Sequence, residues 1–277
     1  KIVRKDIGIS VQAEGMRLTE AEDFVPLFPP RKKNTNKGSY GKAVILAGSL
    51  RYSGAPLLSA AAALRTGCGY TCLALPEELF FACIGKYPEA ILTRAPSENG
   101  NLRFDESFLR SLTVGADCLA VGMGCGVSRG VYDILCFLLH EYKGVLLIDA
   151  DGLNSLAAFG VQVLENASCK VILTPHPKEF SRLADIELSE VLQQGAAQAT
   201  AFAQRYGCTV LLKGCTSVIT DGKEVLLNAE GTPALAKGGS GDVLSGIIAS
   251  LAARGIPPLQ AAACGAFLLG RAGVCAA

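Results

Sequence analysis

The run Val145-Leu146-Leu147-Ile148 is entirely apolar and passes directly into the polar stretch Asp149-Ala150-Asp151-Gly152. Consecutive apolar residues without alternation are typical of a strand that is buried on both faces, as in a parallel sheet covered by helices. Parallel neighbours require long crossover connections, which are usually helical. This stretch therefore predicts an α/β fold, provided that similar runs recur with helix-length segments between them.

Similar runs recur along most of the chain, each bounded by Gly, Asp or Pro: residues 43–47, 70–75, 118–121, 171–173 and 209–212. Helix-length apolar segments separate or follow them, at residues 56–66, 131–142, 177–184, 188–206 and 243–254. This alternation predicts a three-layer α/β/α sandwich with a mostly parallel central sheet. Residues 217–220 and 224–227 flank an Asp-Gly-Lys turn and predict an antiparallel hairpin at one edge of that sheet.

Composition narrows the classes of partner. Half of the 277 residues are hydrophobic, and no low-complexity linker interrupts the chain after the first forty residues, so one large domain fits best. A net charge of +1 leaves no electrostatic footprint for nucleic acid or an anionic membrane. The basic cluster Arg31-Lys32-Lys33 is short and precedes the first strand, which favours a solvated linker. We expect neither nucleic acid nor a membrane as partner.

The cysteines and the N-terminus indicate the compartment. The eleven cysteines are spread singly, without a CxxC pair, which is typical of small buried residues in a reducing environment rather than of a zinc site or a disulfide framework. The N-terminus has no apolar signal-peptide core, and no window reaches about 18 uninterrupted apolar residues. The sequence predicts a cytoplasmic protein.

Lys237-Gly238-Gly239-Ser240-Gly241-Asp242 precedes an apolar run with helical spacing. Glycines let backbone N–H groups turn toward one phosphate, and the positive end of the following helix lies behind the same anion. The glycine cradle, which we define as Gly238, Gly239, Ser240 and Gly241, is therefore predicted to form a phosphate anion hole beside the carboxylate of Asp242. The alternative is that Asp242 only caps the helix. Taken alone, the residue types leave these two interpretations even.

Ligands of open α/β sheets gather where strands end, so the residues that directly follow each strand, which we call its exit, are candidates. The first exit, residues 48–54, either approaches a ligand or turns tightly into a helix. Gly122-Met123-Gly124-Cys125-Gly126 places three glycines after a strand, but it lacks the rest of a dinucleotide fingerprint. Asp149 and Asp151 either orient water or a hydrated divalent cation near phosphates, or cap the next turn.

Two later exits carry further polar groups. His176 lies between Pro175 and Pro177, whose restricted backbones favour a ligand contact for the imidazole. The Lys213 loop, Lys213-Gly214-Cys215-Thr216-Ser217, offers an ammonium, small polar groups and backbone donors that suit a nucleotide, with a surface turn as the alternative. The GxxxxGK[ST] pattern and the protein-kinase motifs are absent from the sequence, so a nucleotide must bind differently from the P-loop class.

Five segments in this order resemble the ADP- or ATP-dependent NAD(P)H-hydrate dehydratases of the ribokinase-like superfamily: KGSYGKAVILAGS (37–49), IDADGLN (148–154), LTPHPKEFSRL (173–183), LLKGCTS (211–217) and KGGSGDVLSGIIASLAARG (237–255). The resemblance covers about residues 36 to 273. Sugar, hydroxymethylpyrimidine and hydroxyethylthiazole kinases share the glycine cradle and its Asp. The segments TPHPKEF and KGSYGKA are more specific to the dehydratases.

The resemblance implies roles for individual residues. Asp242 matches the residue at the reacting centre. The nucleotide-binding positions match Lys213, Gly214, Cys215, Thr216, Ser217 and Gly241, and the positions that bind the hydrated dinucleotide match Ala43, Gly124, His176 and Asp242. Cys215 departs from the family pattern, in which small residues are common at that position.

The implied reaction returns the S-form of hydrated NADH or NADPH (NADHX, NADPHX) to NAD(P)H, while ADP or ATP is hydrolysed to AMP or ADP and phosphate. Magnesium would accompany the nucleotide, the TPHP segment favours ADP, and the resemblance implies a homotetramer. The alternative is a small-molecule kinase of the same fold, of the hydroxymethylpyrimidine or hydroxyethylthiazole type. A non-catalytic nucleotide sensor is a third possibility, but it would not need Asp242.

The resemblance also divides the chain. Residues 36–277 correspond to the ribokinase-like dehydratase domain, and residues 1–35 form an N-terminal segment or linker. Asp6-Ile7-Gly8-Ile9 resembles the tail of the epimerase domain that precedes the dehydratase in bifunctional versions. We therefore expect either the dehydratase part of such a fusion or a single-domain relative that retains the tail.

Overall fold

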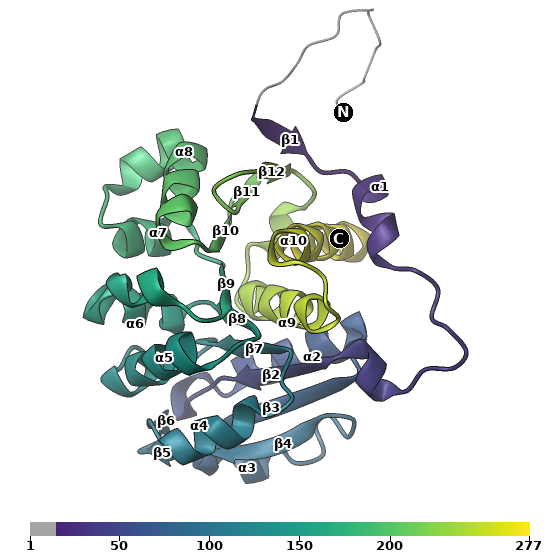
Figure 1. Ribbon diagram of the computed structural model, residues 1–277, viewed down its shortest axis with the longest axis vertical. Helices are drawn as coiled ribbons and strands as arrows, with labels where there is room; N and C mark the ends of the chain where they lie inside the picture. The colour runs from purple at the N-terminus through teal and green to yellow at the C-terminus, as the bar shows by residue number, and fades with distance from the viewer. Residues whose placement is uncertain (1–14) are drawn as a thin grey trace, which may run out of the picture.

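The computed structural model describes residues 15–277 (Figure 1). Within this range one large sheet has the strand order β1-β12-β11-β10-β9-β8-β7-β2-β3-β4. Its strands are β1 (Met16–Leu18), β2 (Lys42–Leu46), β3 (Tyr70–Pro76), β4 (Ile91–Ala95), β7 (Cys118–Val121), β8 (Val145–Ile148), β9 (Lys170–Leu173), β10 (Thr209–Leu212), β11 (Ser217–Thr220) and β12 (Val225–Asn228). All strands from β10 through β4 in this order are parallel, and β11 is antiparallel to both of its neighbours.

Helices cover both faces of the sheet, as Figure 1 shows. One face carries α2 (Gly54–Thr66), α9 (Ser240–Ala253) and α10 (Pro258–Ala276), and the other carries α4 (Glu106–Thr113), α5 (Arg129–Glu141), α6 (Asp151–Phe159), α7 (Pro177–Ala184) and α8 (Leu188–Tyr206). Because side chains alternate along a strand, Ile45 joins the first core and Val44 joins the second. The predicted three-layer α/β/α sandwich is confirmed.

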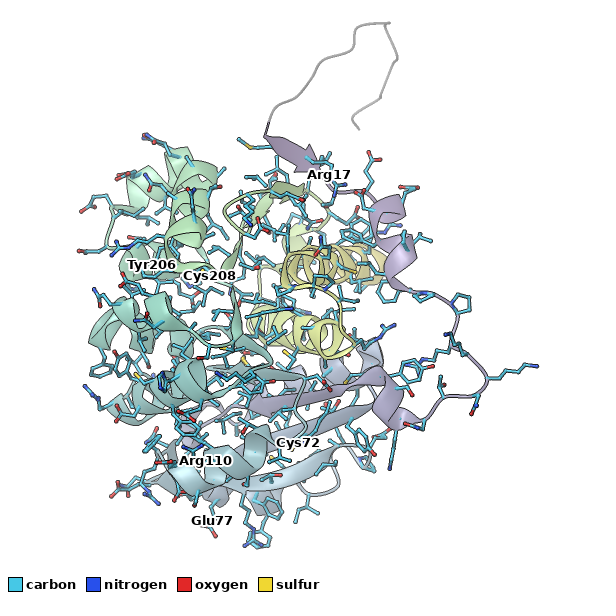
Figure 2. The ribbon with its side chains drawn as sticks, viewed as in Figure 1. Arg17, Cys72, Glu77, Arg110, Tyr206 and Cys208 are labelled. Carbon is cyan, nitrogen blue, oxygen red and sulfur yellow. The ribbon has the colours of Figure 1, made fainter. Side chains whose placement is uncertain are left out.

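Shorter elements complete the fold: α1 (Ala21–Phe24), α3 (Glu77–Cys83) and the small hairpin of β5 (Ser97–Glu98) and β6 (Asn101–Leu102). Figure 2 shows charged side chains at the periphery, among them Arg17, Glu77 and Arg110, whereas Cys72 of β3 is buried within the sheet. These three charged groups are thus kept in water, whereas the small apolar side chain of Cys72 lies in the core.

Helix α9 is held tightly against α2. A Cβ atom added to Gly246 would lie 2.1 Å from the carbonyl oxygen of Ser59, so only glycine permits the two backbones to approach this closely. At the same crossing, Ser59 Oγ donates a hydrogen bond of 2.9 Å to the backbone oxygen of Asp242. The α2–α9 contact therefore fixes the first turn of α9, where Asp242 lies.

Two edge strands differ from the prediction. The hairpin of β11 and β12 is not the edge of the sheet, because β1 pairs in parallel with β12 outside it. At the opposite edge β4 extends the sheet beyond β3. Both were missed because β1 is exposed at every position and β4 at some, so neither has the continuous apolar run of a buried strand. The domain boundary near residue 36 stays a prediction, and Asp6-Ile7-Gly8-Ile9 lies outside the described residues.

In the part of the chain that the structure describes, α10 is the one helix long and apolar enough to cross a membrane by length and composition. Half of it is buried inside the fold, where it packs against α9 and against β9 to β12. These contacts are those of a core helix in an α/β protein, which passes the same test of length and apolarity.

Candidate active site

Five strands of the sheet are parallel neighbours, so their exits meet along its carboxyl-terminal edge, where the strands end; these strands are β2, β7, β8, β9 and β10. Backbone hydrogen bonds join consecutive exits: Gly48 N donates to Met123 O at 2.9 Å, Asp151 N to Gly122 O at 3.2 Å and Lys213 N to Pro175 O at 2.8 Å. The polar residues that follow these strands therefore lie together. The N-terminus of α9 faces the same edge, since Ser245 and Gly241 both lie near Asp149.

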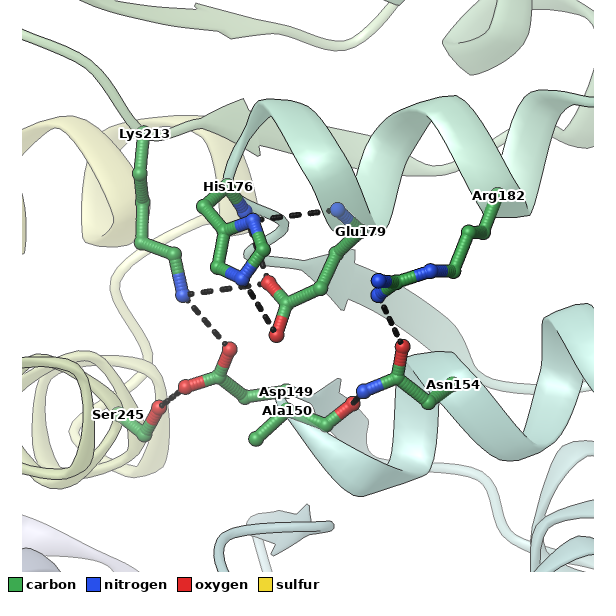
Figure 3. Close-up of polar contacts among 8 residues, drawn as sticks. All are labelled: Asp149, Ala150, Asn154, His176, Glu179, Arg182, Lys213 and Ser245. Atoms are coloured by element: carbon green, nitrogen blue, oxygen red, sulfur yellow. Dashed lines mark hydrogen bonds and ion pairs between the residues drawn. The ribbon is translucent and has the colours of Figure 1, made fainter. Parts of the chain in front are cut away.

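A buried ion pair stands at the centre of this edge (Figure 3). Asp149 is 1% exposed, its Oδ1 lies 3.0 Å from Lys213 Nζ, and its Oδ2 accepts a hydrogen bond of 2.7 Å from Ser245 Oγ. Glu179 Oε2 is 3.8 Å from the same ammonium. Burial opposes the charge of Lys213, but the carboxylates of Asp149 and Glu179 outweigh it and raise the pKa of the lysine. Lys213 therefore remains a cation at neutral pH.

The ammonium of Lys213 borders the glycine cradle. A Cβ atom added to Gly241 would lie 3.8 Å from Lys213 Nζ and 3.8 Å from Asp149 Oδ2. An anion bound to the backbone N–H groups at the start of α9 would thus meet the ammonium as well. Asp149 caps no helix, because the N-cap position of α6 is Ala150. The carboxylate of Asp149 instead serves as counterion to Lys213, a role that the sequence did not reveal.

Asp242 lies in the first turn of α9 and does not cap it. The N-cap position belongs to Gly239, whose φ of +94° requires a glycine-like backbone. Burial, and next the negative charge of Asp149, raise the pKa of Asp242 to about 6, although Lys213 partly offsets them. A partly buried carboxylate with this pKa can accept a proton near neutral pH. The capping alternative does not account for Asp242.

A cavity of about 540 Å³ opens between the Lys213 loop, α9 and α10. Six predicted residues line it: Lys213, Gly214, Cys215, Ser217, Ser240 and Gly241. Its other lining is largely apolar, with Leu235, Leu244, Ala266 and Leu269. Polar groups at one end and apolar walls elsewhere suit a nucleotide whose base enters the apolar part. Thr216 belongs to the same loop but does not line the cavity, and neither do Gly238 and Gly239.

The glycine loop after β7 is held by Asp151 and lies against Tyr52 and Ala55. Asp151 Oδ2 accepts a hydrogen bond of 2.8 Å from Gly126 N and so holds the loop in place. Gly124 has a φ of +66°, and a Cβ atom on it would lie 2.7 Å from Tyr52 Cβ and 3.0 Å from Ala55 Cβ. The loop thus packs against the segment that leads into α2. A substrate contact at Gly124 stays a prediction.

His176 forms a capping box with Glu179 at the start of α7. Its Nδ1 accepts a hydrogen bond of 3.1 Å from Glu179 N, while Glu179 Oε2 accepts one of 2.8 Å from His176 N. The contact requires an unprotonated Nδ1, in keeping with a pKa that burial lowers. Nε2 lies 3.4 Å from Glu179 Oε1, and the side chain is 46% exposed. The capping role was missed, and the predicted ligand contact of His176 remains untested.

Ala43 is the one predicted site residue that the structure keeps away from this edge. It is fully buried and pairs with Thr71 and Cys118 at the amino end of β2, whereas the site lies at the carboxyl ends of the strands. The structure therefore does not support a substrate contact at Ala43. At the other end of β2, the segment that follows the strand includes Ala55, which lies next to Gly124.

Ala150 stores backbone strain between the two aspartates. Its φ of +50° is unfavourable for a residue with a side chain. Its carbonyl oxygen accepts hydrogen bonds from Asn154 N at 3.0 Å and Asn154 Nδ2 at 3.2 Å, which hold the conformation. The resulting turn sends the carboxylate of Asp149 toward Lys213 and that of Asp151 toward Gly126. Strain of this kind clusters at functional sites.

The mostly parallel three-layer fold, the glycine cradle, the partly buried carboxylate of Asp242 and the nearby cavity are those expected of the ribokinase-like class. A ribokinase-like superfamily protein from Enterococcus faecalis superposes with a TM-score of 0.79 at 26% identity, covering 95% of this chain and 89% of the other. The family model described as NAD(P)H-hydrate dehydratase matches residues 43–277. The chain belongs to the NAD(P)H-hydrate dehydratase family.

Relatives of two lengths match the chain. An ADP-dependent (S)-NAD(P)H-hydrate dehydratase of Cenarchaeum symbiosum is 34% identical over 93% of this chain and 88% of its own. A bifunctional NAD(P)H-hydrate repair enzyme of Hyperthermus butylicus is 37% identical over 89% of this chain but 46% of its own, so the chain spans about half of such relatives. The Bacillus subtilis dehydratase co-crystallised with ATP and Mg²⁺ has a TM-score of 0.73 at 28% identity, covering 90% and 84% of the two chains.

Proposed function

We propose that this chain dehydrates the S-form of NADHX and NADPHX and hydrolyses ADP or ATP in doing so. The observation that carries the proposal is the position of Asp242. Its carboxylate, with a pKa of about 6, stands at the start of α9, where the nucleotide cavity and the Lys213 ammonium adjoin the glycine cradle. Family membership supports the identity of the substrate, since relatives that match almost end to end carry this activity in their names.

The chemistry begins with phosphoryl transfer. Hydroxide is a poor leaving group, so the ring hydroxyl of the hydrate is first converted to a phosphate ester. Asp242 accepts the hydroxyl proton while the oxygen attacks the terminal phosphorus of the nucleotide, and the bond to the rest of the nucleotide breaks. The glycine cradle and Lys213 stabilise the charge on the transferring group. AMP leaves when ADP is the donor, and ADP leaves when ATP is.

Elimination completes the reaction. The lone pair of the ring nitrogen expels the phosphate, and the carbon–oxygen bond breaks with both electrons on oxygen. The adjacent carbon then loses a proton, which the departing phosphate can accept, and the ring double bond returns. The products are NAD(P)H, the shortened nucleotide and inorganic phosphate, and the proton first taken by Asp242 passes to water. Nucleotide hydrolysis and dehydration are thus coupled through one ester.

The residues of the site fit a magnesium ion that would be held mainly by the phosphates of the nucleotide. Among residues 15–277, no group of three or more His, Cys, Asp or Glu side chains could hold a metal ion. Asp149 is already engaged by Lys213 and Ser245, which leaves Asp151 and Asp242 as the carboxylates able to meet a hydrated ion. This fits Mg²⁺, which usually keeps several waters and binds through phosphates and one or two carboxylates. The ion would neutralise phosphate charge.

The wider setting is also a proposal. A cytoplasmic location is proposed because singly spread cysteines are typical of proteins in a reducing compartment. A homotetramer is proposed from the family resemblance alone. A preceding epimerase domain is proposed because bifunctional relatives extend well beyond the matched part. Mass spectrometry of the native protein distinguishes a fused form from a chain of about this size.

The direct test incubates the protein with NADHX and either ADP or ATP. We expect the absorbance of NADH to return, together with inorganic phosphate in equal amount. A small-molecule kinase would instead accumulate a stable phosphorylated product from an alcohol such as hydroxymethylpyrimidine. No return of NADH with either nucleotide would reject the proposal.

The raised pKa of Asp242 predicts a pH dependence. A general base must be ionised, so kcat/KM should fall by about tenfold per pH unit below the pKa of the free enzyme. We therefore expect activity to rise through about pH 6 and to level off above it. The measurement is a profile of kcat/KM in buffers that do not bind Mg²⁺. A flat profile between acid and neutral pH would remove Asp242 from the role of base.

Cys215 provides a chemical footprint of the nucleotide. Its thiol is exposed and lines the cavity, whereas Cys275 is exposed on α10 and does not line it. ADP at about ten times its Kd should slow alkylation of Cys215 by iodoacetamide about tenfold, because only the free protein reacts. Peptide mass spectrometry follows both sites. Equal rates at Cys215 with and without ADP would place the nucleotide elsewhere, and slowing at Cys275 as well would indicate a global effect.

A further inference from the structure

We infer that Asn228 reads the nucleotide base and selects adenine by accepting a hydrogen bond from its exocyclic amino group. The inference rests on the proposed function, because it assumes that the cavity holds an adenine nucleotide. Asn228 ends β12, is 4% exposed and lines the cavity. No partner hydrogen-bonds its Oδ1 within the part of the chain that the structure describes. A buried amide oxygen without a partner is costly unless a ligand donates to it.

The amide is held in one orientation. Its Nδ2 donates a hydrogen bond of 3.3 Å to the backbone oxygen of Glu230. Reversing the amide would set Oδ1 against this carbonyl oxygen, so Oδ1 is the amide atom that is left without a partner in the wall of the cavity. The backbone of Glu230 is itself fixed, because α10 packs against it so closely that a Cβ atom on Gly270 would lie 2.3 Å from its oxygen. The site thus presents a fixed acceptor.

The acceptor lies at the base end of the cavity. Lys213 and Gly241 mark the phosphate end, at the exit of β10 and the start of α9. β12 lies two strands beyond β10 in the sheet, which at about 4.8 Å per strand is about 10 Å. This distance matches the reach from the terminal phosphate of a nucleoside diphosphate to its base. The apolar lining residues Leu235 and Leu269 supply walls for a planar ring.

The acceptor distinguishes between purines. Adenine carries an amino group that donates to Oδ1, whereas hypoxanthine carries a carbonyl oxygen at the same position and would face Oδ1 as a second acceptor. A site built to pair with a donor discriminates strongly against a ligand that lacks it. We expect wild-type protein to bind ADP at least about tenfold more tightly than inosine diphosphate.

The test measures the Kd of ADP and of inosine diphosphate by calorimetry for wild type, Asn228→Ala and Ser217→Ala. Asn228→Ala should weaken ADP about tenfold, leave inosine diphosphate within about twofold and so abolish the preference. Ser217 is the control, because it is directly opposite Asn228 in the β11–β12 pair and also lines the cavity. Its Oγ is engaged with Gly214, so its loss should affect both nucleotides equally.

The outcomes separate the inference from the function on which it rests. Equal weakening of both nucleotides by Asn228→Ala would mean a contact to ribose or phosphate, or a structural role, and would overturn the inference. Wild-type binding of ADP without preference over inosine diphosphate overturns it too, even if the variant does not fold, and leaves the proposed function standing. Failure of the wild type to bind ADP or ATP would overturn both.

Discussion

Replacing Asp242 by Asn should lower turnover of NADHX by about a thousandfold or more, within the range that a general base contributes. The amide keeps the size of the side chain but cannot accept the hydroxyl proton. Nucleotide affinity should stay within a few-fold, because the lining of the cavity comes from the Lys213 loop, the end of β12 and the segment that follows it, α9 and α10, and Asp242 is not part of it. Steady-state kinetics and ADP titration measure the two quantities separately.

The same variant should also change how the stability of the folded protein depends on pH. The pKa of Asp242 is raised from 3.8 to about 6, so the folded protein binds this proton more tightly than the unfolded chain does. The contribution of this proton to the free energy of unfolding is present at low pH and is lost as pH rises through about 6. Asp242→Asn should therefore melt at a higher temperature than wild type at pH 8, and the difference should shrink toward pH 4. A lower melting point at pH 8 would contradict this electrostatic account.

Asp151→Asn is the matched control for the loss of turnover. Its amide oxygen can still accept the hydrogen bond from Gly126 N, so the loop after β7 should keep its position. We expect a loss of activity of about tenfold, because the amide keeps this hydrogen bond and its oxygen can still accept from a water of the hydrated ion, but it carries no charge. Near-normal turnover of Asp242→Asn, or an equal loss in both variants, would withdraw the assignment of Asp242 as the base.

Replacing Lys213 by Met should impair both stability and activity. It leaves the carboxylate of Asp149, which is 1% exposed, without its counterion. Removing one partner of a buried ion pair typically costs about 3–5 kcal/mol, so a loss of unfolding free energy of about 3 kcal/mol is expected. Turnover should fall by about a hundredfold or more, because the transferring phosphoryl group loses a fixed cation. Denaturant titration and kinetics measure the two effects.

A second substitution separates these two roles of Lys213. In Lys213→Met with Asp149→Asn, the charge of Asp149 is gone while the amide can still accept from Ser245 Oγ, and only the more distant carboxylate of Glu179 lacks the ammonium. Most of the lost stability should return, but activity should not, since the phosphate still lacks the ammonium. If the double variant were no more stable than Lys213→Met, the ion pair would not be what stabilises this edge. Full activity in either variant would exclude Lys213 from catalysis.

Local sequence predicted much of the fold. The apolar runs identified the buried strands, and helices α7 and α8 coincide with the predicted residues 177–184 and 188–206. These elements could be predicted because their signals are local: a short apolar run indicates a strand buried on both faces, and prolines and glycines mark the ends of helices. The edge strands β1 and β4 could not be predicted in this way, since whether an exposed segment forms a strand depends on its pairing with a neighbouring strand more than on its own composition.

The site was predicted as a set of residues but not as a network. Asp149 contacts Lys213, which lies 64 positions later in the sequence, and Ser245, which lies 96 positions later. No local sequence pattern could therefore predict either contact. The capping box of His176 lies within four residues, yet a histidine is not among the usual N-cap types. Ala43 was placed in the site by resemblance to a motif, and the register of β2 moves it to the far end of the strand.

The central claim is that the ring hydroxyl is converted into a phosphate ester and that the phosphate is then expelled at the same site. The most direct measurement uses NADHX whose ring hydroxyl carries the heavy isotope of oxygen, incubated with this protein and ADP. We predict that the label appears in inorganic phosphate, one atom for each NADH formed, because the ester forms on that oxygen and breaks at carbon. Label found in water, with unlabelled phosphate, would show that the hydroxyl leaves without being phosphorylated and would contradict the account.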